Sequence, residues 1–435
     1  MLRGPFLSDI DSRAAVKGSR DPLGQVSIWT RFGRHVVGNL STVSTSVRDF
    51  TVLLIGLWLI ERALEDDGAQ HEVDIFLRWE QLAGYARALH AGGSFRGVEK
   101  VRANLQAGGR QWLSADRGYQ ILGNQKIYGI WGLYTVPATS SALASGSPLV
   151  LRPAARAFVE SNYVSAFAKA GFRDANAIRR LVAAPKSALL PDSKDEKLVA
   201  AVGRILRPDR LSSAERAFYD TYLVRGGPDD DTGGLQQQLA ELLEPTLSVP
   251  AYELTPRSVA RLAAQAGQRS TADALGWRLE RIRACEAVMA PAYRLFLFLL
   301  ARDGKPLTAV ADEVRATWGE GLPSIDTTDF RALLPELRQS VGDEAACARW
   351  VEIADTLAAG DYATAIRALV THNAFTMKQR GAGAPWVDVE RDRLRVRFRD
   401  DLAALPGRKE LPSLWRFPYF LDSLRVVTRQ VRGTA

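Results

Sequence analysis

Residues 391–399 alternate between basic and apolar side chains, in the order Arg-Asp-Arg-Leu-Arg-Val-Arg-Phe-Arg. As a β-strand, this segment would place its apolar residues on one face and its arginines on the other, because side chains alternate along a strand. A row of guanidinium groups is suited to a polyanion, since each neutralised phosphate releases condensed counterions. The segment therefore predicts a nucleic-acid contact through Arg393, Arg395, Arg397 and Arg399.

Two other interpretations of this strand stay open. Charged side chains on an edge strand also resist pairing with another sheet edge, and an acidic partner protein would bind the same arginines. The positive charge is local: from residue 361 to the end, 14 Lys and Arg stand against 8 Asp and Glu, so this tail carries +6 of the formal charge of +8. Arginine outnumbers lysine 47 to 10 in the whole chain, a bias that a GC-rich bacterial coding sequence also produces.

A second basic segment, between residues 95 and 126, mixes aromatic side chains with cations. Aromatic rings between basic residues can stack on nucleobases, although such rings are more commonly core residues with charged neighbours. We favour the core interpretation for the rings and keep Arg117 and Lys126 as candidate phosphate contacts. The segment comprises Phe95, Arg96, Lys100, Arg102, Arg110, Trp112, Arg117, Tyr119 and Lys126.

One pair of residues has a spacing that is known from catalysis. Arg367 and His372 are separated by four residues, and this spacing resembles the motif of the HEPN family, helical nucleases in which a paired arginine and histidine act on the RNA phosphodiester. The resemblance covers six residues and implies a ribonuclease with these two residues in catalysis. Family motifs usually have a polar residue after the arginine, and here that residue is Ala368. In the alternative interpretation, His372 caps a helix before Gly381.

Other motifs of catalysis or metal binding do not occur in the sequence. The carboxylates of residues 191–197 lie within one short segment, whereas a magnesium-dependent nuclease places its carboxylates on neighbouring strands. The acidic run 229–231 lacks the alternating ligands of a calcium loop. Glycine motifs for nucleotides, a nucleophile elbow and a zinc-binding H-E-x-x-H are missing. We therefore predict no metal and no cofactor, and we favour a non-enzymatic role.

The composition is that of a globular protein that folds without disulfides. A chain of 435 residues, 46% hydrophobic and 24% charged, is long enough for two or three domains. Cys285 and Cys347 lie far apart and form no metal motif, which favours a reducing, cytoplasmic location. The apolar run 50–60 has 11 residues, fewer than the roughly 20 that span a bilayer. We expect it to form a core helix, and we expect no membrane partner.

Helical patterns fill most of the chain and predict a mainly α-helical, two-domain protein. The Gly- and Asp-rich segment 226–234 has no apolar residue to bury, so we place a linker there. We expect only helices over 172–223 and one continuous stretch of helix over 343–370. The predicted regions are an N-terminal arm at 1–48, which packs on the body or on a partner, a helical domain at 49–225, and a second helical domain at 235–435 that ends in a basic β-hairpin.

Residues 124–160 have a more specific pattern. They predict a helix, a tight turn at 135–137, a short helix at 137–144, and a strand at 149–151 that runs into a helix. This order resembles the winged-helix proteins over residues 70–160. The resemblance implies DNA binding, with 137–144 as the recognition helix and with Thr139 and Ser140 near base edges. That helix holds no Arg, Lys, Asn or Gln, the usual base-reading side chains, so we expect phosphate contacts rather than sequence-specific reading.

These observations predict a nucleic-acid-binding or scaffold subunit of a bacterial multi-protein complex, of the phage-defence or DNA-processing kind. We expect duplex DNA, bound through its phosphates, and other protein subunits as partners. The alternatives are a HEPN-like ribonuclease that uses Arg367 and His372, and an adaptor whose arginines bind an acidic partner protein. Salt-dependent binding to duplex DNA would separate the first role from the adaptor, and loss of RNA on incubation would indicate the nuclease.

Overall fold

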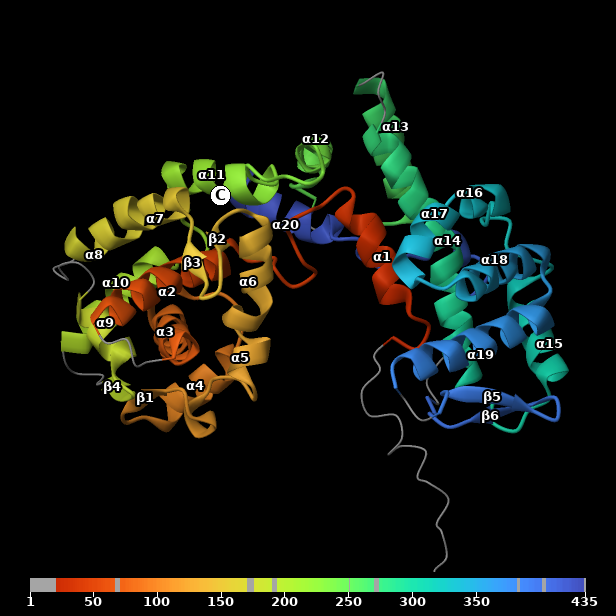
Figure 1. Ribbon diagram of the computed structural model, residues 1–435, viewed down its shortest axis with the longest axis horizontal. Coiled ribbons are helices and arrows are strands. Elements are labelled where there is room, and N and C mark those ends of the chain that lie inside the picture. The colour runs from red at the N-terminus through yellow and green to blue at the C-terminus, as the bar shows by residue number, and fades with distance from the viewer. Residues whose placement is uncertain are drawn as a thin grey trace, which may run out of the picture. The chain divides into compact units, whose positions relative to one another are not determined.

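The fold is mainly α-helical, as the sequence predicts, and its strands form three separate antiparallel pairs in the described part of the chain (Figure 1). Contacts divide the chain into unit 1, made of Met1–Val36 and Ala251–Tyr419, and unit 2, made of Val37–Pro250 and Phe420–Ala435. Each unit is described by itself. The computed structural model of the chain describes residues 21–66, 71–169, 176–189, 194–249, 251–269, 274–381, 384–400 and 404–433.

The predicted linker at 226–234 lies inside unit 2. Its acidic run forms an ordered turn, because the Asp230 carboxylate accepts hydrogen bonds from the backbone N–H groups of Thr232 (3.0 Å) and Gly234 (2.8 Å). The predicted arm is divided between the units. Its helix α1 (Gln25–Arg34) belongs to unit 1 and buries apolar side chains, whereas the residues from 37 onward belong to unit 2.

Unit 2 is built around α2 (Val47–Asp66). The predicted core run lies in this helix, and its side chains from Val52 to Ile60 are buried. No helix in the described residues is long and apolar enough to cross a membrane. The unit also contains α3 (Glu72–Ala86), η1 (Arg87–Ala91), α4 (Val98–Ala107), α5 (Gln125–Tyr128), α7 (Pro153–Val159), η3 (Glu160–Val164), α8 (Ser165–Lys169), α9 (Asn176–Ala183), α10 (Lys194–Ile205), α11 (Ser213–Tyr219), η5 (Asp220–Val224), α12 (Leu235–Leu243), η6 (Glu244–Thr246) and α20 (Leu421–Arg432).

Helix α6 (Ile130–Ser140) corrects one prediction. It runs through Pro137, so the turn expected at 135–137 and the separate helix expected at 137–144 are wrong. Proline is common at the start of a helix, which led to that expectation. Inside a helix it removes one hydrogen-bond donor and its ring crowds the carbonyl four residues earlier, but α6 continues past it. Its carbonyl still accepts a hydrogen bond from the Ser141 N–H (2.9 Å). The expected strand is present as β3 (Val150–Leu151), which pairs with β2 (Ala144–Ser145).

A second strand pair in unit 2 was not predicted. Strand β1 (Gln111–Ser114) pairs with β4 (Lys186–Leu189), with Trp112 opposite Ala188. In Figure 1, β1 and β4 lie beside each other although they are far apart in the sequence. The prediction of helices alone over 172–223 is therefore wrong at β4. Neither strand alternates between apolar and polar side chains, because β1 reads Gln-Trp-Leu-Ser and β4 reads Lys-Ser-Ala-Leu, so the pattern that indicates a strand is missing.

Unit 1 is a helical assembly in which α14 (Ala274–Leu299) is largely buried. The stretch predicted as one helix over 343–370 is two helices, because the chain turns at Gly360, where φ is +75°. A Cβ atom at Gly360 would lie 2.1 Å from the Glu320 carbonyl oxygen, so only glycine fits this turn. The other elements are α13 (Pro256–Arg269), α15 (Leu307–Trp318), α16 (Thr327–Arg331), α17 (Leu334–Val341), α18 (Glu344–Ala359), α19 (Tyr362–Gln379) and η7 (Leu411–Ser413).

The predicted basic hairpin is present as β5 (Val387–Glu390) and β6 (Arg393–Val396), and it packs on α19. Its two turn residues, Arg391 and Asp392, both have positive φ, the conformation of a type I′ hairpin turn. The free edge of β6 is covered, because the Leu394 N–H donates to the Lys305 carbonyl (3.0 Å). β6 is therefore not an open edge strand.

Candidate nucleic-acid interface

Two buried amides position strand β1 in unit 2. Gln81, on α3, pairs with the backbone of Ser114 in both directions: its Nε2 donates to the Ser114 carbonyl (2.8 Å), and its Oε1 accepts from the Ser114 N–H (2.9 Å). Gln125 donates to the Leu77 carbonyl (2.9 Å) and accepts from Gln81 (3.2 Å). Because a buried amide without partners is costly, this arrangement fixes β1 against α3 and α5.

Strand β1 presents Trp112 beside Tyr119, and a lysine from β4 lies against both rings. The Lys186 ammonium is 4.4 Å from the Trp112 ring centroid and 4.2 Å from that of Tyr119. Its Nζ donates to the Tyr119 hydroxyl at 2.7 Å. Both rings are only partly buried, so they are not core residues as we expected from the sequence. The sequence contains no pattern that would place Lys186 here, since it depends on the pairing of β1 with β4.

A basic cavity of about 240 Å³ opens beside these rings. Four residues of the predicted basic and aromatic segment line it: Lys100, Arg110, Trp112 and Tyr119. Arg96, Arg102 and Lys126 from the same segment do not. The full lining is Tyr85, Lys100, Asn104, Ala107, Gly108, Arg110, Gln111, Trp112, Gly118 and Tyr119.

The cations around this cavity are available to a ligand. Lys100, Arg110 and the neighbouring Arg117 are exposed, and within the described residues none of their side chains forms a hydrogen bond or an ion pair. A cation without a carboxylate partner contributes its whole charge to the local field, so this surface attracts anions. Phosphate is the anion that a cluster of Lys and Arg beside aromatic rings suits best.

The arginine strand in unit 1 is different. Its alternation is as predicted, with Leu394 at 1% exposure and Val396 buried, while Phe398 is half-buried. Each arginine, however, has a partner in its own unit. Arg393 donates to the Gly304 carbonyl (2.8 Å), Arg395 pairs with Glu390 (2.7 Å), Arg397 with Asp388 (3.6 Å), and Arg399 with Asp303.

The two residues of the HEPN-like spacing are not brought together. Arg367 is exposed and pairs with Asp392 (2.5 Å), whereas His372 is 2% exposed. The His372 Nε2–H donates a hydrogen bond to the Leu23 carbonyl (3.1 Å), and the ring packs edge-on against Trp350. Burial lowers the pKa of His372 to about 4. The ring is therefore neutral near pH 7 and lies inside α19 rather than at its end, so it does not cap the helix.

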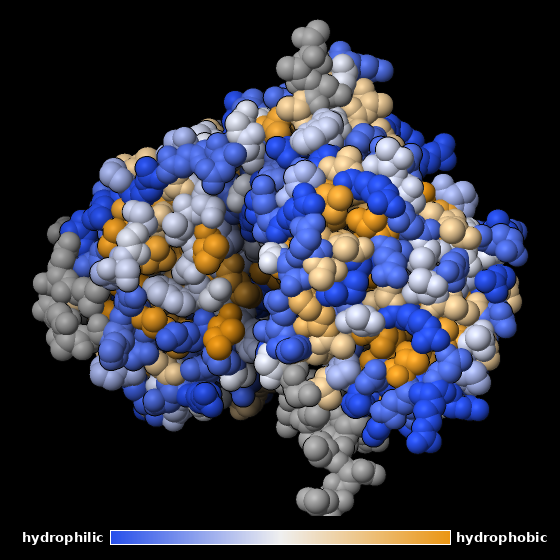
Figure 2. Space-filling view, turned by 45° about the vertical axis from the view of Figure 1, so that its right-hand side comes forward, coloured by the Kyte–Doolittle hydropathy of each residue, from blue (hydrophilic) through white to orange (hydrophobic). Residues whose placement is uncertain are grey.

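The remaining predicted contacts lie on the surface of unit 2. Thr139 and Ser140 are exposed in the last turn of α6, and Lys126 is exposed on α5. Near them Val136 is 67% exposed, and α6 carries no charged residue. On the face drawn in Figure 2, apolar residues form separate patches among hydrophilic ones. Within α5 and α6, Lys126 is the only Lys or Arg.

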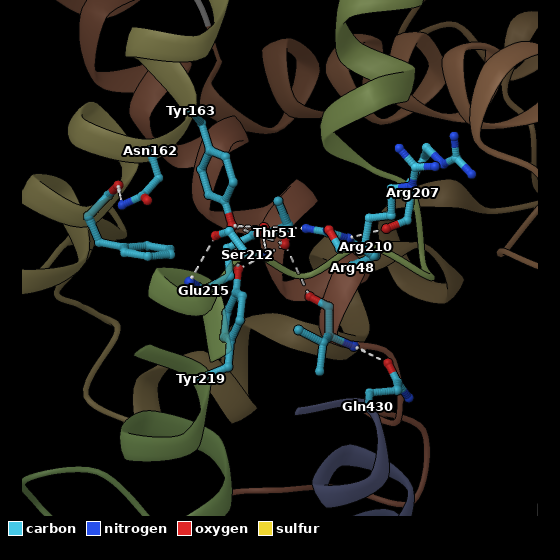
Figure 3. Close-up of polar contacts among 12 residues, drawn as sticks. Arg48, Thr51, Asn162, Tyr163, Arg207, Arg210, Ser212, Glu215, Tyr219 and Gln430 are labelled. Carbon is cyan, nitrogen blue, oxygen red and sulfur yellow. Dashed lines mark hydrogen bonds and ion pairs between the residues drawn. The ribbon is translucent and has the colours of Figure 1, made fainter. Parts of the chain in front are cut away.

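A buried polar network in unit 2 has the appearance of an active site but is structural (Figure 3). Arg48 forms an ion pair with Glu215 and donates to the carbonyls of Arg207 (2.8 Å) and Arg210 (2.6 Å). Tyr163 donates to the same carboxylate at 3.0 Å. The carboxylate also caps α11. Each charge therefore has its partners within the protein, as a buried ion pair requires.

Two buried carboxyl groups have strongly shifted pKa values. Burial raises the pKa of Glu80 to about 7, and it does the same to Glu286 in unit 1. Glu80 accepts from the Ile130 N–H (2.7 Å) at the start of α6 and from Gln125 Nε2 (2.9 Å). Through these contacts the Glu80 carboxyl group positions the start of α6. Among the residues that the structure describes, no cluster of His, Cys, Asp and Glu could hold a metal ion.

Comparison with models of known protein families, with curated proteins and with solved structures gave no match.

Proposed function

We propose that this protein binds nucleic acid without cleaving it, through the phosphate groups, at the basic cavity of unit 2. The observation that carries the proposal is the pair Lys100 and Arg110, which line the cavity beside the rings of Trp112 and Tyr119 and form no ion pair with any described residue. Arg117 does not line the cavity, but it is exposed next to the lining residue Gly118 and is a third cation without a partner among the described residues. Cations supply the electrostatic part of nucleic-acid affinity, and aromatic rings add stacking with little sequence preference. A role as a subunit of a larger complex belongs to the same proposal. The winged-helix resemblance of residues 70–160 adds no support, because 137–144 is not a separate recognition helix.

The arginine strand has a smaller part in this proposal. A phosphate that binds Arg395 or Arg399 must displace a carboxylate that already neutralises the guanidinium. Exposed ion pairs are worth roughly 0–1 kcal/mol, so displacement is feasible. The freed carboxylate then repels the polyanion, which reduces the net gain. We therefore expect the strand to bind a polyanion only weakly.

The salt dependence of binding tests the proposal. Three phosphate contacts give a slope of log K against log salt of about −2.7 for duplex DNA and about −2.1 for a single strand. Between about 50 and 200 mM salt, affinity should therefore fall roughly 40-fold for a duplex and roughly 20-fold for a single strand. Fluorescence anisotropy with short labelled oligonucleotides measures both values.

Two charge-reversal variants compare the two basic surfaces. Lys100→Glu with Arg110→Glu should weaken binding by more than about tenfold and flatten the salt slope, because two of three contacts are lost. The matched control, Arg395→Glu with Arg399→Glu, reverses the same number of charges on the paired strand and should change affinity by less than about threefold. Absence of binding at low salt would refute the proposal, and a larger effect in the control would move the site to the hairpin.

A cleavage assay tests the non-enzymatic part. Labelled RNA and DNA should stay intact on incubation with the protein, with or without Mg²⁺, because Arg367 and His372 lie in different environments and His372 is buried. The variants Arg367→Ala and His372→Ala should behave as the wild type. Cleavage that disappears in His372→Ala would replace this proposal with the ribonuclease.

A further inference from the structure

A larger cavity of about 430 Å³ adjoins the basic cavity in unit 2. The two cavities share three lining residues, Tyr85, Gly108 and Gln111, so they lie next to each other in unit 2. The volume lies within the range of small-molecule sites. Four of its ten lining residues are aliphatic: Leu89, Leu105, Leu189 and Val199.

We propose that this cavity receives one unpaired nucleobase of a single-stranded nucleic acid, an inference that rests on the function proposed above. The faces of a base are apolar and its edge carries hydrogen-bonding groups, and the cavity has the same division. Its aliphatic wall suits the faces, and His90, Gln111 and Glu196 are the polar side chains that can meet the edge. A base within a duplex cannot enter, because its edge is paired and its faces are stacked.

The charges on the two sides fix the orientation of the nucleotide. Lys100 and Arg110 line the basic cavity on one side of the shared wall, and the Glu196 carboxylate lines the apolar cavity on the other. The phosphate belongs with the cations, and the base belongs with the carboxylate. A carboxylate accepts hydrogen bonds from an exocyclic amino group, as in contacts to cytosine N4. The cavity should therefore prefer cytosine to thymine, which has no amino group.

The backbone around the cavity keeps its entrance open. Gly108 and Gly109 have φ of +74° and +77°, and a Cβ at either position would meet no atom within 4 Å. On another side, the π-helical turn η1 carries Leu89, which is 53% exposed. π-Helical turns occur frequently at functional sites. Contact with a base would remove the Leu89 side chain from water.

Single-stranded oligonucleotides of equal length test the inference by fluorescence anisotropy. The wild type should bind oligo(dC) about tenfold more tightly than a fully abasic strand, because stacking on the protein contributes roughly 1–3 kcal/mol per base. Leu89→Trp places a larger side chain at the cavity and should lower oligo(dC) affinity by at least about threefold, with abasic binding unchanged. The base-dependent affinity that remains comes from stacking on Trp112 and Tyr119. Val136→Trp, at an exposed apolar residue outside both cavities, is the matched control and should bind as the wild type.

A second variant tests the orientation. Glu196→Ala should abolish a preference of threefold or more for oligo(dC) over oligo(dT), whereas Glu99→Ala, at an exposed carboxylate on α4, should keep it. Equal affinity of the wild type for abasic and base-containing strands would refute the inference, as would base-dependent binding that Leu89→Trp leaves intact. With either of these two outcomes, loss of binding in the double variant Lys100→Glu with Arg110→Glu would still support the proposed function, phosphate binding at the basic cavity. Failure of every strand to bind would refute both.

Discussion

Replacing the buried acid Glu286 with glutamine should stabilise the protein at neutral and alkaline pH. The Glu286 carboxyl accepts from the backbone N–H groups of Arg416 and Phe417 (3.1 Å) and from the Tyr419 hydroxyl (2.8 Å). In Glu286→Gln, the amide oxygen keeps the two backbone contacts, and the new NH₂ group can donate to the tyrosine oxygen. The substitution therefore preserves the hydrogen bonds and removes the charge.

The magnitude follows from the pKa of Glu286, which burial raises from 4.5 to about 7. Between these values the folded protein keeps a proton that the unfolded chain has lost, so the free energy of unfolding falls as pH rises through this window. The loss is about 3 kcal/mol in total. Glu286→Gln should equal the wild type in stability below pH 4.5 and exceed it by up to about 3 kcal/mol above pH 7.

Urea denaturation across this pH range, followed by tryptophan fluorescence, measures the difference between variant and wild type. Taking the difference cancels the other titrating groups. Glu80→Gln is the informative control: the Glu80 pKa is also about 7, but the new NH₂ group would face the NH₂ of Gln125, at a cost of about 1–3 kcal/mol. Its gain above pH 7 should therefore nearly vanish. A Glu286→Gln difference that does not change with pH would refute this reasoning.

Three further predictions concern stability and use the same urea assay. Arg48→Met should lower the free energy of unfolding by about 3–5 kcal/mol, because it leaves the buried Glu215 carboxylate without its cation. Arg399→Met, which breaks an exposed ion pair, should lower it by no more than about 1 kcal/mol. Equal losses in the two variants would contradict a structural role for the buried network. Gly360→Ala should destabilise the protein by well over the roughly 1–2 kcal/mol that a left-handed conformation costs a residue with a side chain, because the new Cβ would overlap the Glu320 carbonyl. Gly342→Ala is the control: Gly342 is also left-handed but has open space around it, so this variant should lose only roughly 1–2 kcal/mol. In Glu286→Gln, the free energy of unfolding should fall by about 3 kcal/mol as pH decreases from 6.5 to about 4, because in this window His372 is protonated in the unfolded chain but not in the folded protein. A free energy of unfolding that does not change between these pH values would contradict the buried, neutral histidine.

Much of the local structure could be predicted from the sequence. The apolar run in α2 and the alternation of β6 each arise from residues that are close in sequence. The mainly helical fold class follows from the same periodic patterns. Local patterns suffice in these cases because a helix or a hairpin strand is formed by contacts between near neighbours.

The candidate site depended on contacts between distant residues. Trp112 and Tyr119 could be listed from the sequence as aromatics among cations, but their partial exposure depends on the pairing of β1 with β4 and on the Gln81 amide. The sequence also favoured the arginine strand as the main contact. It could not show that carboxylates such as Asp303 and Glu390 would neutralise those arginines.

The sequence alone therefore determined that the fold is mainly helical, where the core helix of unit 2 lies, and which side chains carry charge. Tertiary structure decided which charges remain available. Lys100 and Arg395 are both exposed cations, yet among the described residues only the arginine forms an ion pair. Coulomb interactions depend on distance in space rather than on distance along the chain, so folding, and not composition, places the free positive charge at the cavity of unit 2.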